Sequence, residues 1–168
     1  MSENSAPETP LEELPERSRQ VAEALQAAGV RPQVRRLEES ARTAALAAQA
    51  LGSEVGAIAN SLVFMAGEAP VLVLTSGRHR VATKALAARL DLPRLDRAEP
   101  EQVRTATGQA IGGVAPVGHP TPLTTVVDEA LADYDRIWAA AGTPETVFPT
   151  THDELVRLTK GRSLPVAE

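Results

Sequence analysis

Hydrophobic residues recur at helical spacing near the start of the chain. Within residues 15–28, Val21, Leu25 and Ala28 lie three or four positions apart, which places them on one face of a helix. Gly29 follows directly, and glycine is common just past a helix end because it adopts a left-handed backbone conformation without strain. The pattern therefore predicts an amphipathic helix that ends at Gly29.

The next segments alternate between strand-like and helix-like patterns. Residues 33–37 are typical of a short strand, and the small apolar residues of 44–51 predict a helix that ends at Gly52, with Ser40 as its candidate N-cap. Residues 58–65 and 71–75 are apolar and rich in strand-forming residues, and a turn-like segment at 67–70 separates them. These two segments predict a central β-hairpin.

The second half of the chain mixes short helices and short strands. We predict helices over residues 77–90, 100–107 and 151–158, the last capped by Thr150 or Thr151, and a helical turn over 128–132. We predict strands over 124–127, 135–140 and 146–148. Because there is neither a regular βαβ alternation nor a repeat of fixed period, the pattern indicates an α+β fold with a mixed sheet.

The length of 168 residues fits a single domain. Residues 1–10 are polar and contain two prolines, so we expect a disordered tail there and place the domain at residues 11–165. No segment has the roughly 18 consecutive apolar residues of a membrane span or the pattern of a secretory signal peptide. The expectation is a cytoplasmic protein without membrane contact.

Composition excludes several kinds of chemistry. The chain has no cysteine, so thiolate catalysis and cysteine-based metal sites are ruled out. His79, His119 and His152 are far apart and match none of the common metal-binding spacings, and the chain has neither a phosphate-binding loop nor a GxSxG motif. We therefore expect no metal, no cofactor and no covalent catalysis by a protein nucleophile.

The charge balance argues against strong nonspecific binding of nucleic acid. The formal net charge is −5, so we expect no DNA partner, and any contact with RNA is expected to be weak and salt-sensitive. Arg78 and Arg80 could form a local basic patch, although solvated surface side chains explain them as well.

The stretch from Gly108 to His119 is the strongest candidate for a functional site. The segment from Gly108 to Pro122 holds four glycines and three prolines yet keeps apolar residues, which predicts a structured loop. The adjacent Gly112 and Gly113 allow successive amides to point the same way, and Pro116 restricts the loop. The segment could thus present a nest of N–H donors to an anion or a developing oxyanion. A tight turn at a sheet edge explains the same spacing.

Three blocks of the sequence resemble the YbaK/EbsC family of aminoacyl-tRNA deacylases, also known as the domain associated with prolyl-tRNA synthetase. The first block extends from Leu51-Gly52 to IANSLV at residues 58–63, the second from Thr107-Gly108 to GGVAPVG at 112–118, and the third is TVVD at 125–128. The resemblance covers roughly residues 20–160 in matching order. It implies a mainly antiparallel, partly barrel-like central sheet flanked by helices.

The resemblance implies a trans-acting proofreading enzyme that hydrolyses the ester between a wrongly attached amino acid and its tRNA. Selection by binding alone is weak for small side chains, because one methylene is worth about 1 to 3 kcal/mol, so a hydrolytic second sieve has a physical purpose. In the family a GxxxP loop, here residues 112–116, places its amides on the substrate carbonyl, and a ribose hydroxyl of the substrate helps to activate water. This assigns Gly112 and Gly113 to catalysis and Pro116 to substrate binding, without a cofactor.

Position 60 departs from the family pattern. Most members carry Lys followed by Ser or Thr where this chain has Asn60-Ser61. Asn60 can still donate and accept hydrogen bonds, but it forms no ion pair with phosphate. We assign Asn60 to catalysis and Ser61 to substrate binding. The alternative for Asn60 is a strand-end residue that satisfies backbone groups.

Other positions are weaker candidates for substrate binding. The resemblance implies that Ala140 and Gly142 line the pocket with Thr43, which favours a small or moderately apolar amino acid. Three further candidates also have a structural explanation. Thr75 and Asp128 could be caps of helical segments, and His119 could be a surface loop residue.

The resemblance also implies partners, and two alternative functions stay open. The expected partner is the acceptor end of aminoacyl-tRNA, delivered by a synthetase or an elongation factor. The first alternative is a relative that binds tRNA ends, an aminoacyl group or a synthetase without hydrolysis. The second is an unrelated protein that binds a small ligand with the nest of N–H donors.

Overall fold

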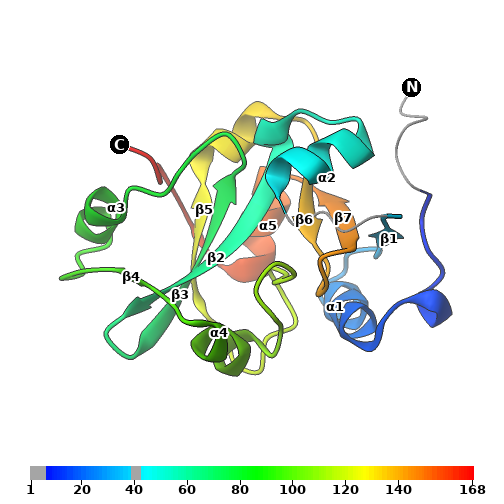
Figure 1. Ribbon diagram of the computed structural model, residues 1–168, viewed down its shortest axis with the longest axis horizontal. Coiled ribbons are helices and arrows are strands. Elements are labelled where there is room, and N and C mark those ends of the chain that lie inside the picture. The colour runs from blue at the N-terminus through cyan, green and yellow to red at the C-terminus, as the bar shows by residue number, and fades with distance from the viewer. Residues whose placement is uncertain (1–6, 39–42) are drawn as a thin grey trace.

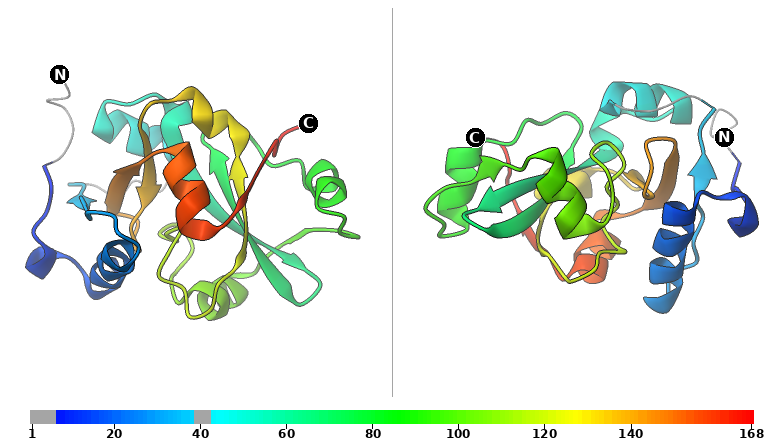
Figure 2. Two further views of the ribbon diagram at one scale, coloured as in Figure 1. Left: turned by 180° about the vertical axis from the view of Figure 1, so that it is seen from behind. Right: turned by 60° about the horizontal axis from the view of Figure 1, so that its bottom comes forward.

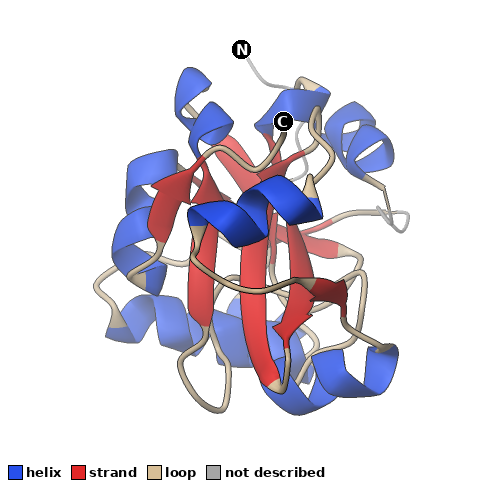
Figure 3. Ribbon diagram, turned by 90° about the vertical axis from the view of Figure 1, so that its left-hand side faces the viewer, coloured by secondary structure: helices blue, strands red, loops and turns tan. Residues whose placement is uncertain are grey.

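The computed structural model describes residues 7–38 and 43–168, in which one mixed sheet lies between helices (Figures 1 and 3). The helices are α1 (Glu16–Ala27), α2 (Ala44–Leu51), α3 (Thr83–Arg89), α4 (Pro100–Thr107) and α5 (His152–Thr159), with short 3-10 helices η1 (Leu11–Glu13), η2 (Val55–Ala57) and η3 (Glu129–Asp133). The strands are β1 (Arg35–Arg36), β2 (Ile58–Ala66), β3 (Ala69–Ser76), β4 (Asp96–Arg97), β5 (Thr124–Asp128), β6 (Ile137–Ala140), β7 (Thr146–Thr150) and β8 (Arg162–Leu164).

The predicted hairpin forms the centre of the sheet as β2 and β3. The two strands are antiparallel over their whole length. Because side chains alternate between the faces of a strand, β3 contributes Leu72 and Leu74 to one hydrophobic core and Val71 and Val73 to another. The first core also takes side chains from α1, α4, α5 and the loop after α4, and the second takes side chains from α3. Helices therefore cover both faces of the hairpin.

The sheet has the strand order β1-β7-β6-β2-β3-β5-β8, and β4 pairs with a second part of β2. The pairs β2–β6, β3–β5 and β5–β8 are parallel, and the other pairs are antiparallel. The mixed, mainly antiparallel sheet is thus confirmed. The described strands do not close into a ring. The terminal strands β1 and β8 are only two and three residues long, too short to supply a closing ladder.

Helix α3 begins later than predicted. The expected helix starts at residue 77, whereas α3 starts at Thr83. The backbone N–H of Gly77 instead donates to the carbonyl of Ile58 at 2.8 Å, and that of His79 donates to the carbonyl of Ser76 at 2.9 Å. Residues 77–82 therefore form a loop, although Val81 still packs against the second core.

Most predicted helix ends are confirmed. Gly52 ends α2 with a φ of 64°, and the hydroxyl of Thr151 caps α5 by accepting from the backbone N–H of Glu154 at 3.1 Å. The candidate cap Ser40 lies outside the described residues, and the hydroxyl of Thr43 caps α2 by accepting from the backbone N–H of Leu46 at 3.1 Å. The short strands β4 and β8 were missed because their residues are mostly polar.

The end of the predicted N-terminal tail lies against the sheet. Residues 1–6 are outside the described residues. Within the described part, Thr9 donates its backbone N–H to the carbonyl of Val34 at 2.8 Å, and Glu8 forms an ion pair with Arg31 at 3.2 Å. Residues 8 and 9 are therefore attached to the strand edge at β1, while the domain limits of 11–165 stay a proposal.

Candidate active site

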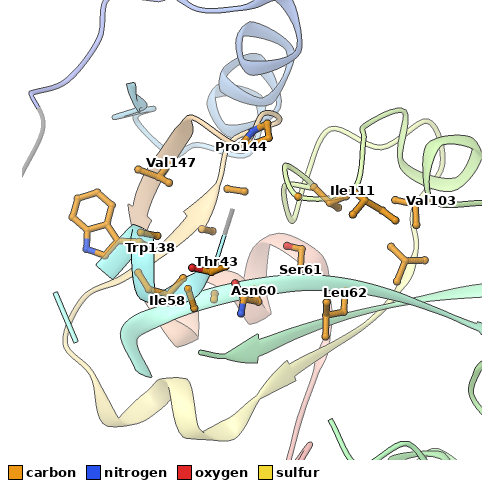
Figure 4. Close-up of a pocket in the computed structure, with 18 of the residues that line it drawn as sticks. Thr43, Ile58, Asn60, Ser61, Leu62, Val103, Ile111, Trp138, Pro144 and Val147 are labelled. Carbon is orange, nitrogen blue, oxygen red and sulfur yellow. The ribbon is translucent and has the colours of Figure 1, made fainter. Parts of the chain in front are cut away.

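A cavity of about 610 Å³ opens beside β2 (Figure 4). Its wall is built from the first turn of α2, the middle of β2, the loop after α4, strand β6 and the β6–β7 turn. The loop after α4 and the β6–β7 turn lie side by side, although about thirty residues separate them in the chain (Figures 1 and 2). The tertiary fold therefore joins three of the segments that the family resemblance had singled out.

The cavity exists because one edge of β2 is only partly paired. On this edge β2 pairs with β6 at Ile58 and Ala59 and with β4 at Phe64 and Met65. In the described chain, residues 60–62 have no strand neighbour on that edge. A strand edge without a neighbour presents unpaired backbone groups, which a bound molecule can use. The middle of β2 is therefore open to a ligand.

Asn60 and Ser61 both lie at this opening. Neither side chain makes a hydrogen bond within the described residues, and the hydroxyl oxygen of Ser61 is buried. Ser61 points from β2 toward the space between Ile111 and Pro144, whereas Asn60 and Leu62 lie on the other face of the strand (Figure 4). A buried hydroxyl without a partner is uncommon in folded proteins, so Ser61 is a ready hydrogen-bonding group for a ligand.

The glycine-rich loop after α4 is held in place by Gln109. This buried side chain accepts a hydrogen bond from the backbone N–H of Ala115 at 2.6 Å and donates to the carbonyl of Val117 at 3.4 Å. Its own backbone N–H donates to the hydroxyl of Thr107 at 3.0 Å. The loop is therefore structured, as its apolar residues predicted.

The amides of the loop are not equally available. The N–H of Gly113 donates to the carbonyl of Ala110 at 3.1 Å, and that of Ala115 is taken by Gln109. Within the described chain, the N–H groups of Gly112 and Val114 have no acceptor, and both residues line the cavity. In this structure the Gly113 N–H is therefore engaged by an internal carbonyl, whereas the N–H groups of Gly112 and Val114 are the donors left for a substrate.

Gly113 has a steric role instead. A Cβ atom at this position would lie 2.6 Å from the Cα of Thr143. Real Cβ atoms do not approach backbone atoms so closely, so only glycine fits here without displacement. Gly112 differs, because its φ of 93° lies in the left-handed region that favours glycine while the space around it is open.

The other predicted site residues divide into two groups. Thr43 and Ala140 line the cavity. The remaining five candidates are not among its lining residues: Thr75, Pro116, His119, Asp128 and Gly142. Of these, Gly142 has a φ of 103° and packs against the backbone of Arg17, which is a structural role. The sequence thus identified part of the cavity wall together with residues that support it.

Asp128 and Thr75 belong to a buried network next to the cavity. The Asp128 carboxylate accepts from the backbone N–H of Ser76 at 2.9 Å and from that of Ala130 at 3.0 Å, which caps η3. The ring Nδ1 of His79 lies 2.9 Å from the same carboxylate, and the Thr75 hydroxyl donates to it at 3.4 Å. Asp128 is therefore an N-cap, as the alternative explanation for this residue had it. Its carboxylate also holds the segment 76–79 through Ser76 and His79.

Two arginines that the site prediction left out line the cavity. Arg80 follows the segment held by Asp128, and Arg97 lies on β4. Both are exposed, and neither forms an ion pair in the described part of the chain. Arg78 differs, because it is paired with Asp133 at 2.8 Å. The cavity therefore has free positive charge, although position 60 carries none.

His119 stabilises the loop as a neutral side chain. Its Nε2 donates to the carbonyl of Ala115 at 2.8 Å, and burial lowers the pKa of the imidazole from the ordinary value of 6.5, an effect that the hydrogen bond to Ala115 partly opposes. The unfolded chain therefore binds a proton more readily than the folded chain.

This difference predicts an acid-dependent loss of stability. The contribution of His119 is fully present above pH 6.5 and falls as the pH drops toward the lowered pKa of the folded state. We expect the free energy of unfolding to decline more steeply below pH 6.5 in the wild-type protein than in a His119→Gln variant, which keeps a donor but does not titrate. Urea unfolding between pH 5 and 8 measures this difference, and parallel pH profiles would contradict it.

Within residues 7–38 and 43–168, no group of three or more His, Asp or Glu side chains is arranged to hold a metal ion. No helix in these residues is both long and apolar enough to cross a membrane.

Comparison with known proteins relates the chain to tRNA editing. A family model described as an aminoacyl-tRNA editing domain matches residues 38–158. The structure of a candidate trans-editing enzyme for prolyl tRNA synthetase is 44% identical, covers 92% of this chain and 99% of that chain, and has a TM-score of 0.87. A structure from the grafting of epitope backbones onto scaffold proteins is 40% identical with the same coverage and TM-score.

A curated relative matches over a shorter segment. The proline–tRNA ligase of Latilactobacillus sakei subsp. sakei (strain 23K) is 38% identical over 71 residues, which is 42% of this chain and 12% of the ligase. The matched segment therefore spans only a small part of that enzyme.

Proposed function

The chain belongs to the family of aminoacyl-tRNA editing domains, and on this basis we propose that it is a trans-acting deacylase that hydrolyses the ester bond of mischarged aminoacyl-tRNA. The observation that carries the proposal is the pair of unoccupied amides of Gly112 and Val114 at a cavity that also holds the unpartnered hydroxyl of Ser61. These are hydrogen-bonding groups without internal partners, and a polar substrate would satisfy them.

The arrangement suits stabilisation of a developing oxyanion. Hydrolysis of an ester places negative charge on the carbonyl oxygen, and fixed backbone N–H donors lower the free energy of that charge. Gln109 fixes the loop before substrate arrives, so little reorganisation is needed at the moment of reaction. In this scheme Gly112 and Val114 hold the carbonyl, Gly113 keeps the loop close to Thr143, and a substrate hydroxyl assists the attacking water.

Asn60 and the two free arginines divide the task of binding the tRNA end. Asn60 lies at the open edge of β2 and supplies an uncharged donor and acceptor, whereas Arg80 and Arg97 supply the positive charge at the cavity. Arginine forms bidentate hydrogen bonds with phosphate, so it replaces a lysine as a phosphate ligand. The loss of charge at position 60 is therefore compatible with binding of aminoacyl-tRNA.

The cavity wall favours an apolar side chain on the amino acid. Small side chains from α2 and β6 form part of it, among them Ala44, Ala47 and Ala140, and the hydroxyl of Thr43 is already engaged as the cap of α2. Such a wall offers few polar partners to a side chain. We therefore propose a small or moderately apolar amino acid as the one removed, with a synthetase or an elongation factor as the delivery partner.

The direct test is loss of the ester bond from charged tRNA. The protein is incubated with tRNAs that carry alanine, serine, cysteine, threonine, proline or 2-aminobutyrate, and the remaining aminoacyl-tRNA is measured over time. We expect at least one small amino acid to be released on the order of a hundredfold faster than in buffer, a rate that preorganised amides can provide. Binding of tRNA without release of any amino acid would instead favour a noncatalytic tRNA-binding protein.

A further inference from the structure

Two arginines cover the ring of Trp138, the only tryptophan of the chain. The guanidinium carbon of Arg35 lies 4.8 Å from the ring centroid, and that of Arg136 lies 5.5 Å from it. Trp138 is itself buried, because it packs in the small hydrophobic core under α2. Contact with an aromatic ring attracts a guanidinium and restricts its orientation. The two cations are therefore held in place before any ligand binds.

These two cations lack an anionic partner. Neither Arg35 nor Arg136 forms an ion pair in the described part of the chain, and the Nε of Arg35 is buried without a hydrogen-bond partner. Burial and the nearby charge of Arg136 lower the pKa of Arg35, and the charge of Glu8 opposes this decrease only in part. The carboxylate of Glu8 forms its ion pair with Arg31 and not with Arg35. Two like charges beside each other, one of them partly desolvated, destabilise the protein unless an anion joins them.

The arginine pair lies directly outside the proposed active site. Trp138 lines the cavity, and Arg136 lies directly before β6 with its guanidinium over the Trp138 ring. Arg35 on β1 pairs across the strands with Val147 on β7, which also lines the cavity. Arg35 therefore lies on β1, two strands from β6, and Arg136 lies next to the start of β6. Strands β7 and β1 lie on the side of β6 away from β2 (Figure 1).

We propose that Arg35 and Arg136 form a binding site for a backbone phosphate of the RNA strand whose aminoacylated end enters the cavity. This inference rests on the proposed function, because a tRNA end brings a phosphodiester next to the ester-bearing nucleotide. A guanidinium fork fits phosphate oxygens, and fixed cations lose little entropy on binding. The net charge of −5 makes such local cations necessary, since the protein as a whole repels RNA.

The test uses binding and turnover in parallel. A short single-stranded RNA that ends in CCA is titrated into the protein while Trp138 fluorescence is recorded, with adenosine as a probe that lacks phosphate. The variants are Arg35→Gln, Arg136→Gln and the double substitution. The matched control is Arg36→Gln, which removes an exposed arginine from the same strand but, by the alternation of side chains, on its other face. Unfolding temperatures verify that each variant is folded, and Arg136 is exposed, so its variant is expected to fold normally.

We expect each single variant to weaken RNA binding about tenfold and the double variant more, because a hydrogen bond to a charged group is worth about one factor of ten or more. The slope of log affinity against log salt should fall by about 0.7 for the phosphate contact that is lost. Adenosine binding and the Arg36→Gln control should not change. In hydrolysis of aminoacyl-tRNA, KM should rise while kcat stays constant.

The outcomes separate this inference from the proposed function. Unchanged RNA affinity in the double variant, an equal effect of Arg36→Gln, or no RNA binding by the wild-type protein would overturn the phosphate site. Arginine-dependent RNA binding without any ester hydrolysis would support the phosphate site and refute the deacylase. Ester hydrolysis with the same KM in the wild-type protein and in both arginine variants would support the deacylase and refute the phosphate site.

Discussion

Replacing Gly113 with alanine should lower kcat for ester hydrolysis about a hundredfold while the protein stays folded. The added Cβ would lie 2.6 Å from the Cα and 2.7 Å from the carbonyl carbon of Thr143. Both are backbone atoms, so the clash cannot be relieved by rotation of a side chain. Either the loop that carries Gly113 or the β6–β7 turn has to move.

The loop is the part that should move, because the turn is fixed from behind. The hydroxyl groups of Thr143 and Thr146 are 2.8 Å apart, and that of Thr146 is hydrogen-bonded to Ser18 on α1 at 2.9 Å. A shift of the loop carries the amides of Gly112 and Val114 away from the substrate carbonyl. A misplacement of about 1 Å is enough to cost about a hundredfold in rate.

Single-turnover hydrolysis of aminoacyl-tRNA measures this effect, and Gly29→Ala is the matched control. Gly29 also has a left-handed φ, of 82°, but an added Cβ there meets nothing within 4 Å. The control should lose about 1 to 2 kcal/mol of stability from backbone strain and keep its kcat. A folded Gly113→Ala variant with wild-type kcat would refute the role of the loop.

The sequence predicted those elements of the fold that short stretches of residues determine. The β2–β3 hairpin, the end of α2 at Gly52 and the cap of α5 at Thr151 follow from short stretches of residues, and the structure confirms them. The family was also predicted correctly, because its motifs are short blocks that do not depend on knowing the fold.

The sequence could not predict which loop amides are free. Two adjacent glycines suggested a pair of donors, but the choice depends on the turn that joins Gly113 to Ala110 and on the side chain of Gln109, which reaches Ala115 across the loop. Neither contact has a recognisable sequence pattern. The available pair in the structure is therefore Gly112 and Val114.

The sequence also could not predict the arginines of the cavity, because tertiary contacts bring them there. Arg97 lies 37 positions from Asn60 in the chain, and only the pairing of β4 with β2 brings it to the cavity. That strand is two polar residues long, so no hydrophobic alternation marks it. Arg80 was considered only as part of a patch with Arg78, whereas the structure pairs Arg78 with Asp133 and leaves Arg80 free.

Replacing Asp128 with alanine should cost about 3 to 5 kcal/mol of the free energy of unfolding. The carboxylate is fully buried and accepts the backbone N–H groups of Ser76 and Ala130, while His79 and Thr75 also contact it. Removal leaves buried donors without an acceptor, and each such group costs about 1 to 3 kcal/mol. Asp128→Asn, which keeps one acceptor oxygen, should lose less.

Urea unfolding measures this loss, and Asp133→Ala provides the control. Asp133 is an exposed aspartate whose ion pair with Arg78 connects the same two segments, yet exposed pairs contribute at most about 1 kcal/mol. The Asp128 variants should also raise KM for aminoacyl-tRNA, because the segment that leads to Arg80 is no longer held at Ser76 and His79. If Asp128→Ala were as stable as Asp133→Ala, the buried carboxylate would not be what organises this side of the cavity.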